Sequence, residues 1–171
     1  AARKGFQAHK EIIELLGRYD VKDIVDANGL TALCVACSTN NIGIVRALIN
    51  IGMKVNPTGT SVTPLIKACC VASIHAGHNR NSSDNVQDIM SPTVKLLLDA
   101  GANVDHQLTT SKNSALHLAA SRGSMNICRL LLDAGGNSKL IDRGGLTAAD
   151  VAKRNHFNNV AVFIENYDGG G

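Results

Sequence analysis

A short motif recurs four times along the chain, and this repetition limits the fold more than any other feature. Each copy begins with Thr or Ser, continues with a small residue or Pro, and then enters an apolar run. The copies begin at Thr31, Thr63, Ser114 and Thr147, at spacings of 32, 51 and 33 residues. A period near 33 residues is typical of proteins in which each unit packs only against its neighbours.

A second landmark recurs in register with the first: two aliphatic residues, two further residues and then glycine. Its copies end at Gly52, Gly101 and Gly135, which lie 21, 38 and 21 residues after the preceding Thr or Ser. The middle unit therefore carries 17 extra residues, placed near 72–91, where Asn and Ser cluster. We expect an exposed loop there. It is either a tolerated insertion or a contact loop, and the sequence leaves both readings open.

The residue types within a unit predict a helix, a turn, a second helix and a hairpin-like loop. The Thr or Ser hydroxyl can cap the first helix, about ten residues long, and Pro64 suits the first helical position because its missing N–H costs nothing there. Asn40 and Gly123 suit the turn that ends this helix. An amphipathic second helix follows and stops at glycine, and turn-rich segments such as 142–145 lead to the next cap.

These landmarks together resemble the ankyrin repeat, most closely at 114–120 and 96–105. The resemblance implies an all-α solenoid of stacked helix-turn-helix units joined by β-hairpin loops, in one domain at 1–168 with a flexible glycine tail at 169–171. Within it we predict a partial repeat at 1–25, repeats at 26–57, 58–108 and 109–141, and a C-terminal capping repeat at 142–168. The first unit lacks a cap motif, which indicates a degenerate repeat or a chain cut from a longer one.

The composition agrees with thin, closely stacked helices and limits the choice of partner. Hydrophobic residues make up 44% of the chain but aromatic residues only 3%, so the core rests on small and aliphatic side chains. A net charge of +3 and few aromatic rings argue against nucleic-acid binding. No apolar run is long enough for a membrane span. Five cysteines without a secretion signal indicate reduced thiols. We therefore expect an intracellular protein, cytoplasmic or nuclear, that is monomeric as an isolated domain.

The motifs that suggest chemistry have simpler structural explanations. Cys34 and Cys37 match a C-x-x-C redox motif, but core packing within a repeat helix explains them. A metal site built from Cys69, Cys70, His75 and His78 lacks familiar ligand spacing. The resemblance implies that His117 stabilises the stack of hairpins, and no nucleophile is implied beside it. We expect no catalytic residues, no metal and no cofactor.

The family resemblance implies a non-catalytic scaffold or adaptor that binds a protein or peptide on its concave surface. The contact residues would flank the hairpins and line the first helices; they are Ala27, Asn28, Leu30, Ser38, Thr39, Thr60, Val62, Cys70, Ser111, Asn113, Ser121, Arg122, Arg143, Leu146 and Arg154. Leu30, Val62 and Leu146 are predicted to be exposed apolar anchors. Alternatively, the chain is a regulatory or targeting segment of a larger enzyme or channel whose chemistry lies elsewhere.

The resemblance also suggests one modification site. Asn56 follows Leu48 by eight residues in the hairpin region, a spacing similar to that of ankyrin sites recognised by an intracellular asparaginyl hydroxylase. An ordinary turn asparagine is the alternative.

Overall fold

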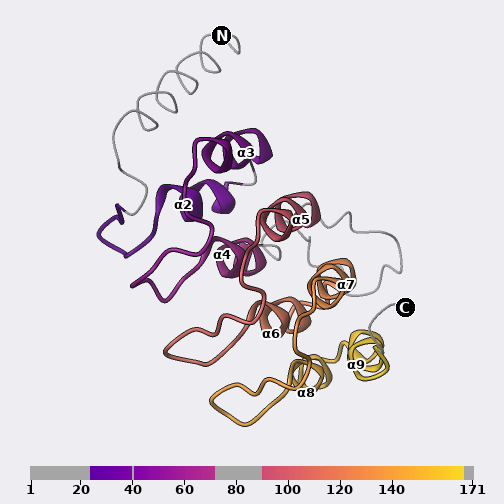
Figure 1. Cartoon of the computed structure of the whole chain (residues 1–171). Coiled ribbons are helices and arrows are strands. Elements are labelled where there is room, and N and C mark those ends of the chain that lie inside the picture. The colour runs from indigo at the N-terminus through magenta and orange to yellow at the C-terminus, as the bar shows by residue number, and fades with distance from the viewer. Residues whose placement is uncertain (1–23, 40, 72–89, 168–171) are drawn as a thin grey trace.

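The computed structural model describes residues 24–39, 41–71 and 90–167, which form a stack of short helices joined by extended loops (Figure 1). The predicted partial repeat at 1–25, the insertion near 72–91 and the tail at 169–171 fall wholly or largely outside these residues. The helices are α2 (Ala32–Ser38), α3 (Ile42–Asn50), α4 (Pro64–Val71), α5 (Ser91–Asp99), α6 (Ala115–Ala120), α7 (Met125–Asp133), α8 (Ala148–Arg154) and α9 (Asn158–Glu165).

The helices form two rows, as the repeat pattern predicts. The first helices of the units, α2, α4, α6 and α8, pack side by side, and the second helices, α3, α5, α7 and α9, form the other row. The loops before the first helices project away from the second row (Figure 1). Aliphatic, Ala and Cys side chains fill the space between the rows, including Leu33, Leu65, Leu97, Leu116 and Leu131. The prediction of an all-α repeat solenoid is confirmed.

Hydroxyl groups start the first helices as predicted. Thr31 Oγ1 accepts a hydrogen bond from the Cys34 N–H, and Thr63 Oγ1 accepts one from the Ile66 N–H, each at 3.3 Å. Ser114 and Thr147 form reciprocal capping boxes with the residues three positions later. These helices have six to eight residues rather than the ten expected. The α6 helix stops early because Gly123 takes a φ of +72° and reverses the chain. Asn40 lies outside the described residues.

Glycine ends the second helices, again as predicted. Gly52, Gly101 and Gly135 have φ values of +86°, +82° and +86°. After α3 the Gly52 N–H donates to the Ile49 carbonyl, and the Met53 N–H donates back to the Leu48 carbonyl. These bonds satisfy carbonyl groups that the helix end would otherwise leave without donors.

The loops between units are hairpin-like, although their pairing is limited to isolated bridges in the described residues. Such bridges join Val25 to Thr31, Gln107 to Ser114 and Ile141 to Thr147. In the first and last of these hairpins an aspartate fixes the turn: Oδ1 of Asp26 and of Asp142 each accepts two backbone N–H groups. Both carboxylates are therefore occupied in holding the loop conformation.

Polar side chains connect each unit to the next. The Asn56 amide donates to the Gly101 carbonyl and accepts from the Asn103 N–H, both at 2.8 Å. Asp105 makes the corresponding contact one unit later, because its Oδ1 accepts the Asn137 N–H at 2.8 Å. These bonds keep the hairpins of successive units in register.

The outer side of the last unit is more polar than the matching positions in earlier units. Six residues after the cap, Cys37, Cys69 and Ala120 are buried, whereas Lys153 is exposed and pairs with Glu165 on α9. Glu165 itself stands where α7 has the buried Leu132. Charged groups resist the stacking of another apolar helix pair. They support a capping role for residues 142–168, which stays a prediction, as do the other repeat boundaries.

Candidate functional site: the hairpin face

The surface on which the predicted contact residues fall is here called the hairpin face. It consists of the loop tips within 26–30, 58–62, 109–113 and 142–146 together with the sides of α2, α4, α6 and α8 that point away from the second helices. In Figure 1 the loops and the first helices lie next to one another along the whole described stack. The fold thus brings together residues that are more than a hundred positions apart in the sequence.

The predicted contact residues differ in their exposure. Exposed members are Ala27, Asn28, Thr39, Arg143 and Arg154. Half-buried members are Leu30, Ser38, Thr60, Val62, Cys70, Ser111, Asn113, Ser121, Arg122 and Leu146. None is fully buried, so each can present at least part of its surface to a partner.

The prediction that Leu30, Val62 and Leu146 are exposed anchors is wrong about their exposure. All three are half-buried, and Val62 packs against the core. The carbonyl groups of Val62 and Leu146 accept contacts from Cys34 Sγ and His117 Nε2 on the preceding first helices. These residues sit where the loop turns into its helix, so their side chains point partly back into the stack.

Several polar side chains of the hairpin face form hydrogen bonds within the protein. The hydroxyls of Ser38, Thr39 and Ser121 donate to carbonyls three residues earlier, at 2.7–2.9 Å. Arg143 Nη1 donates to the Thr110 carbonyl at 2.9 Å and so braces the neighbouring hairpin. A partner would have to compete with these internal hydrogen bonds for the donors. We therefore expect these side chains to contact a partner through their surface shape more than through new hydrogen bonds.

Two further residues lie on the hairpin face but were not among the contact residues predicted from the sequence. Val35 on α2 is 43% exposed, and Lys67 on α4 is half-buried. Both lie four residues after the capping threonine. The same position is half-buried Leu118 in α6 and buried Val151 in α8, so periodicity alone reads it as core. The lysine in an otherwise apolar position was the available signal.

Lys67, Cys70 and Arg122 form a group between α4 and α6. Burial raises the pKa of the Cys70 thiol, and the positive charges of Arg122 and Lys67 partly offset that rise. The Arg122 Nε is buried without a hydrogen-bond partner. The charge of Lys67 also acts on Asp26 of an earlier hairpin: the pKa of Asp26 is lowered first by the Leu30 N–H and to a smaller extent by Lys67.

The cysteines behave as core residues. Cys34, Cys37, Cys69 and Cys128 are fully buried thiols, and Cys70 is a half-buried thiol. Burial raises the pKa of Cys37 to about 12, and the charge of Cys34 adds to this rise. A thiol with such a pKa carries almost no thiolate at neutral pH and is a poor nucleophile. The C-x-x-C sequence is therefore a packing feature.

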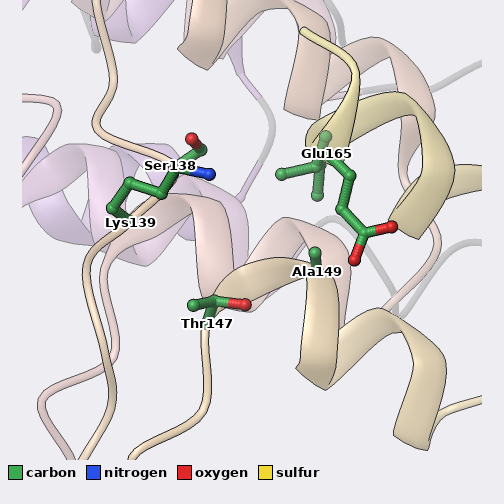
Figure 2. Close-up of a pocket in the computed structure, with 6 residues that line it drawn as sticks. Ser138, Lys139, Thr147, Ala149 and Glu165 are labelled. Atoms are coloured by element: carbon green, nitrogen blue, oxygen red, sulfur yellow. The ribbon is translucent and has the colours of Figure 1, made fainter.

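Two observations on the described residues concern metal and small-molecule sites. The described residues contain no group of three or more His, Cys, Asp and Glu side chains suited to a metal ion; His75 and His78 lie outside them. One pocket of about 100 Å³ lies between the loop after α7, the start of α8 and α9, beside Lys139, Thr147 and Glu165 (Figure 2). Small-molecule sites usually span roughly 300–1,000 Å³, so this pocket is too small for a typical cofactor.

The described helices also differ from membrane spans: within 24–39, 41–71 and 90–167, none is long and apolar enough to cross a bilayer.

Stacked helix pairs with projecting hairpins define a helical repeat protein. A family model for ankyrin repeats, in three copies, matches residues 1–78 and 85–169. The chain belongs to the ankyrin-repeat family.

Relatives with this repeat occur in proteins of different kinds. The chain is 30% identical over 132 residues to "Putative E3 ubiquitin-protein ligase XBAT34" of Arabidopsis thaliana, a match that covers 76% of this chain and 31% of the plant protein. It is 30% identical over 128 residues to "Putative ankyrin repeat protein R664" of Acanthamoeba polyphaga mimivirus, covering 73% of this chain and 70% of the viral protein. Tyrosine-protein kinase HTK16 of Hydra vulgaris is 28% identical over 159 residues, covering 90% of this chain and 19% of the kinase.

Proposed function

We propose that the chain is a non-catalytic scaffold that binds a protein or peptide through its hairpin face. The proposal rests on a contrast between two parts of the structure. Side-chain hydrogen bonds within the protein hold the stack in register, whereas the exposed groups of the hairpin face vary from unit to unit. Ankyrin repeats imply interaction with other proteins. Rigid scaffolds of this kind place variable loop residues in fixed positions, which favours recognition. We propose further that the isolated domain is monomeric and intracellular and that it does not bind nucleic acid.

An alanine scan of the two faces tests this proposal. A partner captured from a cell lysate is first purified, and its affinity for the chain is measured with each predicted contact residue other than Ala27 replaced by alanine. We expect a few of these variants to lose about tenfold or more in affinity, because buried contacts dominate interfaces. The matched controls are Arg46→Ala, Lys95→Ala and Arg129→Ala on the second-helix face, where long exposed side chains are also removed. If only the control variants on the second-helix face lost binding, the result would contradict the proposal.

A second candidate is a regulatory or targeting segment of a larger enzyme. The first and third relatives described above are named as a ligase and a kinase, and the chain spans less than a third of each. The two candidates share the same binding surface. They differ in whether a catalytic domain lies in the same polypeptide, so the full-length open reading frame separates them.

We also propose Asn56 as a candidate for hydroxylation, on the strength of its spacing from Leu48. Its side-chain amide is exposed but holds two bonds to the next unit at 2.8 Å. An enzyme would reach it when this hairpin opens. Intact-mass comparison of the protein from cells with and without the asparaginyl hydroxylase should show a gain of one oxygen atom that Asn56→Ala abolishes. If the protein has the same intact mass from both kinds of cells, the proposal that Asn56 is hydroxylated is wrong.

A further inference from the structure

The hairpin face carries more positive than negative groups. Its cations are Lys67, Lys112, Arg122, Arg143 and Arg154, and its carboxylates are Asp26, Asp142 and Asp150. All three carboxylates accept hydrogen bonds from backbone N–H groups of their own loop or cap. The cations of the helices are less engaged, since Lys67, Arg122 and Arg154 have no hydrogen-bonded carboxylate among the described residues.

These three cations belong to consecutive first helices. Lys67 lies on α4, Arg122 follows the end of α6, and Arg154 ends α8. Because α4, α6 and α8 pack side by side, the three cations follow one another from unit to unit, and we call them the row. On the second-helix face the exposed Lys95 and Arg129 share their helices with the exposed Asp99 and Asp133. On α8 the aspartate that precedes Arg154, Asp150, is instead held in the helix cap by the Thr147 N–H and hydroxyl.

The buried Nε of Arg122 gives this row a centre. It has no hydrogen-bond partner within the described part of the chain, although buried polar groups are nearly always hydrogen-bonded. Among the described residues no carboxylate pairs with this guanidinium. A carboxylate of a partner protein could reach the exposed end of the Arg122 side chain. It would pair with the positive charge of the guanidinium, and this pairing is stronger in a partly buried setting than in water.

We propose that the hairpin face recognises an acidic peptide segment, whose carboxylates pair with Lys67, Arg122 and Arg154 across three successive units. The inference deepens the scaffold function proposed above and rests on it. Neighbouring helices lie about 8–10 Å apart. A peptide in the polyproline II conformation advances about 3.1 Å per residue with three residues per turn, so every third side chain lies on the same side. An acidic side chain at about every third residue would thus meet one cation in each unit. Nucleic acid is the less suitable ligand because the described face offers no aromatic ring on which a base could stack.

The test uses a fluorescein-labelled peptide with glutamate at every third position and Gly and Ser between, together with its lysine counterpart. Fluorescence anisotropy should show binding of the glutamate peptide only. Lys67→Gln/Arg122→Gln should weaken that binding about tenfold, the equivalent of about 1.4 kcal/mol. The matched control is Arg46→Gln/Lys95→Gln, which removes the same charge from the second-helix face and should change affinity less than about twofold. Raising the salt from about 0.05 to about 0.3 M should weaken the wild-type complex.

Other results would overturn the inference. They are equal losses in the two double variants, absence of binding by the glutamate peptide, and binding of a single-stranded oligonucleotide as tightly as the peptide. Thermal unfolding of each variant separates a folding defect from a binding defect: Arg122 and Arg154 also complement helix C-termini, so lost stability with unchanged affinity would assign them a structural role alone.

The scaffold function can survive failure of this inference. If alanine variants of neutral hairpin-face residues weaken a captured partner while Lys67→Gln/Arg122→Gln does not, the surface is right and the acidic ligand is wrong. If only second-helix variants weaken that partner, the scaffold proposal fails as well.

Discussion

Replacing Gly123 with alanine should destabilise the protein by about 2–5 kcal/mol. The φ of +72° disfavours any residue with a Cβ atom, at a cost of about 1–2 kcal/mol. In addition, a Cβ at this position would lie 2.4 Å from Cδ1 and 2.6 Å from Cε1 of Phe157. The half-buried Phe157 ring packs against the core, and displacing it should cost about 1–3 kcal/mol more.

Urea unfolding measures this effect, and a second glycine supplies the control. Gly145 has a similar φ of +76°, but a Cβ there would have no atom within 4 Å. Gly145→Ala should therefore show the backbone cost alone. The ring contact can be isolated by making Gly123→Ala in a Phe157→Leu background, where the added cost should shrink. If Gly123→Ala and Gly145→Ala cost the same, the turn after α6 does not depend on the close approach of Phe157.

Replacing His117 with alanine should cost about 2–4 kcal/mol. The ring is 1% exposed. Its Nδ1 accepts the Ser114 N–H and lies 2.9 Å from Ser114 Oγ, while Nε2 lies 3.1 Å from the Leu146 carbonyl. With Nδ1 as acceptor, Nε2 carries the proton and donates to Leu146. Alanine would leave buried donors and acceptors unsatisfied as well as a cavity, and it would break the link between α6 and the next hairpin.

The same residue should make stability depend on pH. Burial lowers the pKa of His117 below the ordinary value of 6.5, against smaller opposing contributions from the Leu146 carbonyl and Asp142. The unfolded chain therefore binds a proton at a pH where the folded chain still excludes it. Stability from this group is complete above pH 6.5 and is lost as the pH falls from there toward the lowered pKa.

Urea unfolding of wild type and of His117→Gln between about pH 7.5 and about pH 5 checks the sign. Other titrating groups are common to the two proteins, so the difference between the curves isolates His117. We expect the wild type to lose more stability than the variant on acidification. Parallel curves, or a wild type that gains stability relative to the variant at low pH, would refute the assigned burial effect.

The helix starts and helix ends were largely predictable from the sequence because the chemistry of a few neighbouring residues determines them. A hydroxyl followed by a small residue or Pro marks the caps at Thr31 and Thr63, and glycine marks the positive φ at Gly52 and Gly135. Each of these signals acts within a few residues. The period then predicts the packing, because every unit repeats the same contacts with its neighbour.

The surface was less predictable because it depends on contacts between units. Leu30 and Leu146 read as exposed loop residues, yet the turn directs them partly inward. Lys67 reads as an interruption of an apolar position, and only the stacking of α4 against α6 brings it near Arg122. Sequence reasoning located the face through its landmarks, but it could not assign the exposure or the internal hydrogen bonds of each side chain.

The central claim is that partners bind the hairpin face, and mapping amide chemical shifts of the isotope-labelled chain on addition of the purified partner tests it most directly. The claim predicts that the largest shifts fall at residues such as Asn28, Arg122 and Arg154, with little change at Arg46 and Lys95 on the second helices. Shifts that gather on α3, α5 and α7 while the hairpins stay unchanged would contradict it.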